Sequence, residues 1–237
     1  MEATLKPSYL LTVLILILPL YAASCSKPVL KETTPEEKLL EARKDIQKKR
    51  YEKANETLEE LRYATAGTRI GGEVQFLLGE TAFKRGKYPE AESYFAAYLN
   101  TYTNGPFSER SIYLQAESKV KQIQKRKLGF FSFKSYIPYD RDISLLREAR
   151  VLFELYMEKY PTGEWFDIAA KRSKELLIKE GEHEIEIAAF YLKKKSPRST
   201  LARARHLLDS DYPESIKAEA RELIRKAEQS MHSTGDR

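Results

Sequence analysis

The sequence has a single cysteine, Cys25, and three histidines among its 237 residues. One cysteine excludes an intramolecular disulfide framework and a cysteine-rich zinc module, and three scattered histidines leave few ligands for a metal cluster. Glycine and proline are sparse at ten residues each, which excludes collagen-like and low-complexity chains. With 42% hydrophobic and 32% charged residues, the composition is that of a folded protein with a substantial core.

The sequence also lacks an apolar run long enough to span a bilayer. The longest uncharged apolar run, residues 9–20, falls short of the roughly 20 residues that a membrane-spanning helix needs. Because this run follows Lys6 near the N-terminus, it predicts a secretory signal. The small residues Ala22-Ala23-Ser24 then lie directly before Cys25, where a signal peptidase requires side chains that fit a narrow site.

This arrangement resembles a bacterial lipobox. The resemblance implies that residues 1–24 are a lipoprotein signal peptide and that residues 25–34 form a lipidated tether. It also implies a diacylglycerol on the Cys25 thiol and an acyl chain on its amine, with no other cofactor. Two or more acyl chains give stable anchoring, whereas one gives only marginal binding. Ser26 after the cysteine resembles a sorting signal for the outer membrane. The alternative to a lipobox is an ordinary signal peptide cleaved near Ala23, with Cys25 left as a free thiol.

From Pro35 onward the pattern is helical and repeats. Small residues recur at one helical position with a spacing of 37 residues, at Ala42, Gly79 and Ala116. The second unit follows tetratricopeptide offsets through Gly79, Gly86, Ala91 and Phe95. Small residues allow two antiparallel helices to approach closely, and Gly86 supplies a turn with positive φ.

Later units follow the same plan less regularly. The third keeps its second helix at Ala149, Phe153 and Tyr156, after about 21 additional residues. The fourth is predicted from Ala169 and Ala170 on its first helix and from Leu201, Ala204 and Leu208 on its second, and a helix from Ile216 to about Ala227 caps the array. We therefore predict an all-α fold, an α-solenoid of about five tetratricopeptide-like helix pairs. The N-terminal repeats are expected at 35–125. The insertion and the second helix of the third repeat are expected at 126–161, and the C-terminal repeats with the capping helix at 162–230.

Helix pairs of this kind directly after a lipidated cysteine are one part of a more specific pattern. The other parts are an insertion with Gly129-Phe130-Phe131 and Asp140-Arg141-Asp142, and helix ends at Tyr160-Pro161 and Tyr212-Pro213. Together they resemble the BamD family, also called YfiO or ComL, of the outer-membrane β-barrel assembly machinery. The resemblance implies a non-enzymatic scaffold that is anchored in the outer membrane and faces the periplasm. Its implied partners are BamA and other barrel-assembly lipoproteins, C-terminal segments of unfolded outer-membrane proteins, and the lipid bilayer through the anchor.

The solenoid predicts a groove lined by the first helix of each pair. Positions one and five residues after the small residue are expected to point into it, at Arg43 and Gln47, Glu80 and Lys84, and Glu117 and Lys121. Phe76 and Tyr113 could accept an apolar side chain of a peptide, and Lys84 or Lys121 its terminal carboxylate. The candidate peptide-binding residues are thus Phe76, Glu80, Lys84, Tyr113 and Lys121. The alternative places Phe76 and Tyr113 in the core between repeats.

Three arginines, Arg141, Arg198 and Arg203, are candidates for binding a partner, the last two through ion pairs with BamA. Arg141 either faces an interface or fixes the insertion through Asp140 and Asp142, and the aromatic residues of the insertion either fold back on the repeats or contact a partner.

The basic runs at 119–127 and 193–198 are expected to be solvated helix faces, and export argues against nucleic acid as their ligand. His183 is expected on the solvated surface rather than in a metal site.

Two other functions remain open. A different periplasmic tetratricopeptide lipoprotein, one that coordinates peptidoglycan synthesis or cell division, would share the anchor and the solenoid but not BamA binding. A helical-solenoid enzyme such as a lytic transglycosylase would need a further compact domain with a catalytic glutamate, which the sequence does not indicate. We therefore predict neither catalytic residues nor a metal site.

Overall fold

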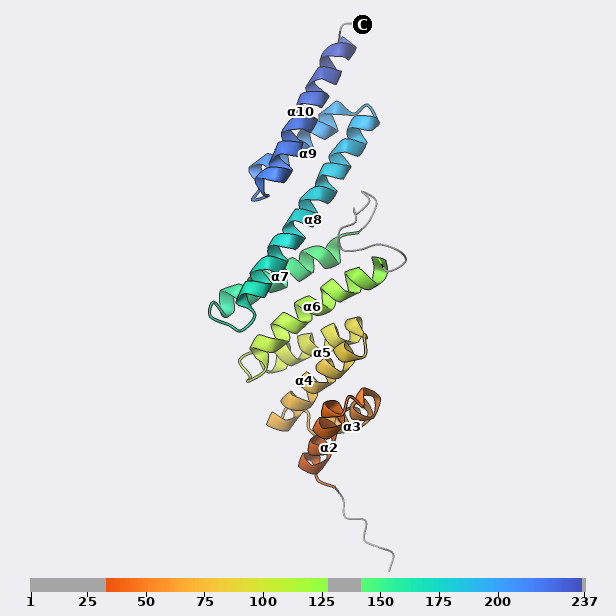
Figure 1. Ribbon diagram of the computed structural model, residues 1–237, viewed down its shortest axis with the longest axis vertical. Coiled ribbons are helices and arrows are strands. Elements are labelled where there is room, and N and C mark those ends of the chain that lie inside the picture. The colour runs from red at the N-terminus through yellow and green to blue at the C-terminus, as the bar shows by residue number, and fades with distance from the viewer. Residues whose placement is uncertain (1–32, 128–141, 236–237) are drawn as a thin grey trace, which may run out of the picture. The chain divides into compact units, whose positions relative to one another are not determined.

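The computed structural model describes residues 33–127 and 142–235, and in these ranges every element is a helix (Figure 1). The helices are α2 (Pro35–Gln47), α3 (Tyr51–Ala64), α4 (Arg69–Lys84), α5 (Tyr88–Thr101), α6 (Ser108–Lys127), α7 (Ser144–Lys159), α8 (Phe166–Lys193), α9 (Pro197–Asp209) and α10 (Glu214–Gly235). The chain divides into the units Met1–Thr34 and Pro35–Arg237, and these helices belong to the second. The all-α prediction is confirmed. None of the described helices is both long and apolar enough to cross a membrane.

The described helices form four antiparallel pairs, α2 with α3, α4 with α5, α6 with α7 and α8 with α9, and α10 packs on the last pair. We call the connection within a pair a forward turn and the connection to the next pair a return turn. Each second helix also packs on the first helix of the following pair. This stacking of pairs is that of a tetratricopeptide-like solenoid.

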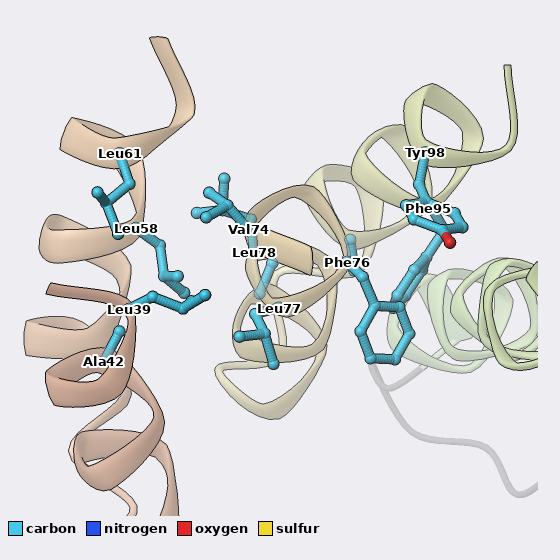
Figure 2. Close-up of a cluster of buried hydrophobic side chains, with 12 residues drawn as sticks. Leu39, Ala42, Leu58, Leu61, Val74, Phe76, Leu77, Leu78, Phe95 and Tyr98 are labelled. Carbon is cyan, nitrogen blue, oxygen red and sulfur yellow. The ribbon is translucent and has the colours of Figure 1, made fainter. Parts of the chain in front are cut away.

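Side chains of α2 to α5 form the first of three core clusters (Figure 2). Leu58 and Leu61 of α3 face Val74 and Leu78 of α4, whereas Phe76 points from the same helix toward α5. Both faces of α4 are therefore buried, which accounts for its apolar sequence. The second cluster draws on α6, α7 and α8 and the third on α8, α9 and α10, so α8 contributes to two cores.

The predicted close approach of the helices is present in the second pair. A Cβ atom placed on Gly79 would lie 2.6 Å from Cε1 of Phe95, a side chain that is fully buried. Gly79 and Ala91 are both at the contact between α4 and α5, as their spacing indicated. A larger side chain at Gly79 has no space without displacement of the ring.

The fourth pair differs from its predicted positions. Ala188, not Ala169 or Ala170, is the small residue of its first helix, since it lies seven residues before a positive-φ turn residue, as Gly79 does. On α9 the hydroxyl of Thr200 donates to the carbonyl of Ala188 over 3.3 Å, so Thr200 takes the place of Ala91. The buried residues that follow are Ala204 and Leu207. The prediction missed this register because α8 has 28 residues, and its N-terminal half packs on α7 before the fourth pair begins.

The forward turns of three pairs share one backbone conformation. Gly86 has a φ of +72°, and the two lysines at the equivalent positions, Lys49 and Lys195, have φ of +57° and +55°. In each turn the N–H of this residue and the next one donate to carbonyls of the last helical turn, for example Lys49 to Ile46 and Arg50 to Asp45. This is a helix C-terminal motif that favours glycine.

We therefore expect Lys49→Gly and Lys195→Gly each to raise the free energy of unfolding by about 0.5–1 kcal/mol, because glycine adopts positive φ without steric penalty. Urea unfolding followed by circular dichroism measures the change. Lys48→Gly is the matched control, since Lys48 lies one residue earlier without a positive φ and should lose stability on substitution. Equal effects of Lys48→Gly and Lys49→Gly would contradict the conformational explanation.

Candidate peptide groove and partner-binding surface

Ion pairs connect the first helices of successive pairs along the predicted groove. They are Arg43 with Glu73, Glu80 with Arg110, and Glu117 with Arg172. The first two occupy the same two positions of the repeat, but with the charges exchanged: the arginine precedes in one and follows in the other. The side chains one residue after each small residue therefore bond to the neighbouring helix.

Glu80, a candidate peptide contact, is part of this series. Its carboxylate pairs with Arg110, and its side chain is only 16% exposed. Burial raises the pKa of Glu80, and the positive charges of Arg110 and Lys84 oppose that rise. Glu80 thus holds two repeats together in this structure, and a peptide would have to compete with Arg110 for it.

Phe76 lies in the core between repeats, the alternative that the sequence left open, and Tyr113 is partly buried against the second core cluster. Phe76 is 2% exposed, and its ring stacks on Phe107 with a centroid distance of 4.5 Å. Tyr113 stacks on Trp165 at 5.1 Å, and burial raises its pKa. A side chain covered in this way is not a surface for a peptide, so Phe76 in particular is withdrawn as a contact residue.

The rings that cover them belong to a motif that the sequence analysis missed. Tyr98, Tyr102, Gly105 and Phe107 recur 58 residues later as Tyr156, Tyr160, Gly163 and Trp165. In both copies the first tyrosine hydroxyl accepts the backbone N–H of the last aromatic residue, at 3.1 Å from Phe107 and 3.0 Å from Trp165. The 58-residue spacing is visible in the sequence. The motif fixes each return turn so that its aromatic residue covers the first helix of the preceding pair, Phe107 on Phe76 of α4 and Trp165 on Tyr113 of α6.

Lys84 and Lys121 are the two basic members of the candidate peptide-binding set. Lys84 is exposed and Lys121 is partly exposed. In the described part of the chain, neither forms an ion pair. They occupy the same position of successive repeats, 37 residues apart. These two ammonium groups are therefore available to an anionic group of a ligand.

Lys119 does not lie on a solvated face, although one was predicted for its basic run. Its side chain is 9% exposed and its ammonium group binds Glu92 of α5 at 3.0 Å and Glu148 of α7 at 2.6 Å. Lys119 thus connects three helices. A buried cation is tolerated here because two carboxylates compensate its charge.

The candidate partner-binding arginines have different surroundings. Arg198 is exposed at the start of α9 and forms no ion pair within the described residues. Arg203 donates to Glu184 at 3.1 Å and lies over the ring of Tyr191 at 5.6 Å. Arg198 is therefore free to bind a partner, whereas Arg203 connects α9 to α8. Arg141 lies outside the described residues, as do Cys25 and the aromatic residues of the insertion.

A network of charged side chains surrounds this region of α8. Glu180 accepts hydrogen bonds from Arg147 at 2.8 Å and Arg150 at 3.2 Å. Glu184 accepts a further bond from Arg147 at 2.9 Å in addition to that from Arg203. The network joins α7, α8 and α9 across the boundary between the second and third core clusters.

His183 lies beside this network and not on the solvated surface, so that prediction was wrong. His183 is 5% exposed, and neither of its ring nitrogens has a hydrogen-bond partner in the described part of the chain. The error has a periodic cause. His183 follows Leu176 and Glu180 by seven and three residues, so it lies on the same buried face of α8.

The family comparison agrees with this architecture. The family model YfiO, described as an outer membrane lipoprotein, matches residues 31–234. The chain belongs to the YfiO family. The match includes all four helix pairs and nearly all of α10, so the family assignment applies to the solenoid as a whole. No curated protein matches the chain. As a YfiO family member, the protein is an outer-membrane lipoprotein.

Proposed function

We propose that the protein is a scaffold of the β-barrel assembly machinery that binds a BamA-type barrel subunit and the C-terminal signals of barrel precursors. The observation that carries this proposal is the YfiO family match over residues 31–234. The solenoid supports it, because stacked helix pairs provide extended binding surfaces. The protein acts by binding, without catalysis, on the periplasmic side of the outer membrane.

Two regions have separate roles in this proposal. The exposed Arg198 at the start of α9 pairs with acidic groups of the barrel subunit. Lys84 and Lys121 hold the terminal carboxylate of a precursor segment, since neither is bonded to an acidic side chain in the described residues. Diacylglycerol and an acyl chain on Cys25 anchor the scaffold in the membrane.

Affinity purification of the tagged protein from detergent-solubilised membranes, with mass spectrometry of the co-eluting proteins, tests the proposal. We expect a BamA-type barrel protein to co-elute. Recovery of peptidoglycan-synthesis or division proteins without it would assign the protein to the other class of periplasmic tetratricopeptide lipoprotein.

Charge reversal at Arg198 tests the location of the interface. We expect Arg198→Glu to weaken binding of the purified barrel subunit by about tenfold or more, because an attractive charge pair becomes a repulsive one. Surface plasmon resonance gives the affinity. Lys159→Glu is the matched control, since Lys159 is also exposed and without an ion pair among the described residues but lies at the end of α7. Arg203→Glu is a poorer probe because it also breaks the bond to Glu184. Equal binding by Arg198→Glu and Lys159→Glu would place the interface elsewhere.

A further inference from the structure

The turns of the solenoid divide its charge between two edges. The forward turns with a complete description contain seven Lys or Arg residues and no acid: they read Lys48-Lys49-Arg50, Arg85-Gly86-Lys87 and Lys194-Lys195-Ser196. The return turns, at 65–68, 102–107, 160–165 and 210–213, contain no Lys or Arg and two acids, Glu164 and Asp211. Basic and non-basic turns are interspersed along the chain, so the separation of charge depends on which turns the fold brings to the same edge.

Antiparallel packing places the three described forward turns at one edge of the stacked pairs. Successive helices alternate in direction, so the connections within pairs lie at one end and the connections between pairs lie at the other. Figure 1 shows the turns from α4 to α5 and from α8 to α9 on one side of the solenoid, and the turns after α5, α7 and α9 on the opposite side. The basic turns therefore form one edge, which we call the basic edge.

Four lysines on or beside these turns are exposed, form no ion pair in the ranges that the structure describes, and have no role in the proposed function. They are Lys48, Lys49, Lys193 and Lys195. Other cations of the edge are compensated, Arg50 by Asp45 and Arg85 by Glu52. These uncompensated charges thus come from the first and fourth pairs.

We propose that the basic edge binds the anionic headgroups of a lipid membrane surface. A cation near an anionic surface contributes about 1 kcal/mol, so several on one edge give substantial binding. All four are lysines, which act as point charges without the fixed geometry of an arginine–carboxylate pair. That suits mobile headgroups better than a defined acidic protein site. The proposal rests on membership of an outer-membrane lipoprotein family and not on any barrel partner.

Vesicle binding by protein that begins at Ser26 tests the proposal without the acyl anchor. This chain retains all three core clusters, which draw on residues from Leu39 to Ile224. We expect it to co-sediment with vesicles of phosphatidylcholine containing one third phosphatidylglycerol, to bind phosphatidylcholine alone far less, and to dissociate at high salt. Equal binding to both vesicles would overturn the proposal.

The decisive variant removes four cations of the edge without damage to the fold. It combines Lys48→Gln, Lys49→Gly, Lys193→Gln and Lys195→Gly, in which both glycines replace residues with positive φ. The control variant removes the same amount of charge from the other side of the solenoid and the start of α10, with glutamine at Lys159, Lys171, Lys174 and Lys217. Neither variant changes a residue assigned to peptide or partner binding.

We expect the edge variant to lose about tenfold or more in affinity for the anionic vesicles and the control to lose little. Equal losses would reduce the effect to net charge and overturn the proposal. A different result would be that the unmodified protein binds polyglutamate but not anionic vesicles, and that the edge variant no longer binds polyglutamate. That result would overturn the lipid proposal and indicate an acidic protein segment as the ligand. Affinity for the barrel subunit is measured separately without lipid, so failure of one proposal is distinguishable from failure of the other.

Discussion

Gly71→Ala should lower the free energy of unfolding by on the order of 3 kcal/mol, a large effect for one added methyl group. Gly71 lies in the first turn of α4, where a Cβ atom would overlap the carbonyl oxygen of Thr65 and lie 2.8 Å from its carbonyl carbon. That carbonyl cannot move aside easily, because it accepts hydrogen bonds from the N–H of Thr68 at 3.1 Å and from the Thr68 hydroxyl at 2.7 Å. Thr68 in turn caps α4 through the N–H of Gly71.

Gly72→Ala is the matched control for this substitution. It adds the same methyl group one position along the same helix, but the nearest atoms are those of the Tyr102 ring at 3.3 Å. A ring can shift by a few tenths of an ångström, and alanine favours the helix, so the loss should stay below about 1 kcal/mol. Chemical unfolding of both variants gives the comparison. Similar stabilities of the two would mean that the Thr65 carbonyl does not constrain Gly71.

Cys25→Ser should move the protein from the outer membrane to the soluble periplasmic fraction or to an uncleaved precursor in the inner membrane. Serine provides no thiol for diacylglycerol, and without the acyl chains the predicted anchor is lost. Membrane fractionation and immunoblotting measure the distribution. Ser26→Ala changes the adjacent residue and leaves the thiol, so it should remain membrane-bound.

High salt distinguishes the anchor from the basic edge. If part of the Cys25→Ser protein stays on membranes and a salt wash releases it, electrostatic binding by the basic edge accounts for the remainder. Retention in the outer membrane that resists salt would contradict the acyl anchor. The two sources of membrane attachment thus give different results in one experiment.

The first two helix pairs were predictable from the sequence because their packing depends on single residues. Gly79 and Ala91 are small for a steric reason, and their 37-residue spacing from Ala42 and Ala54 survives in the sequence. The fourth pair was less accessible, since Thr200 replaces the small residue of the second helix. Lys49 shows that a lysine can occupy the positive-φ position of Gly86, and Lys195 occupies the same position in the fourth pair. The small residue of the first helix lies seven residues before this position, which gives Ala188 in the fourth pair.

The candidate site was predicted less well than the fold. Periodicity placed Phe76 and Glu80 on first helices, but it could not show that a return turn covers Phe76 or that Arg110 binds Glu80. The first contact joins α4 to the return turn after its pair, and the second joins two successive pairs, so both depend on how the chain continues into the next pair. Lys84 and Arg198 are exposed and Lys121 is partly exposed, and no neighbouring pair supplies an acid to them among the described residues, so their binding roles stay predictions.

The exchanged polarity of the two groove ion pairs has a consequence for repeat order. Repeats of similar sequence can mispair, either within a chain or between two chains that swap helices. If α6 stacked directly on α2, Arg43 would meet Arg110, and if α4 stacked on the α4 of another molecule, Glu80 would meet Glu73. Each wrong arrangement opposes like charges where the correct one pairs opposite charges. The two salt bridges therefore disfavour these two wrong arrangements of the repeats relative to the native order.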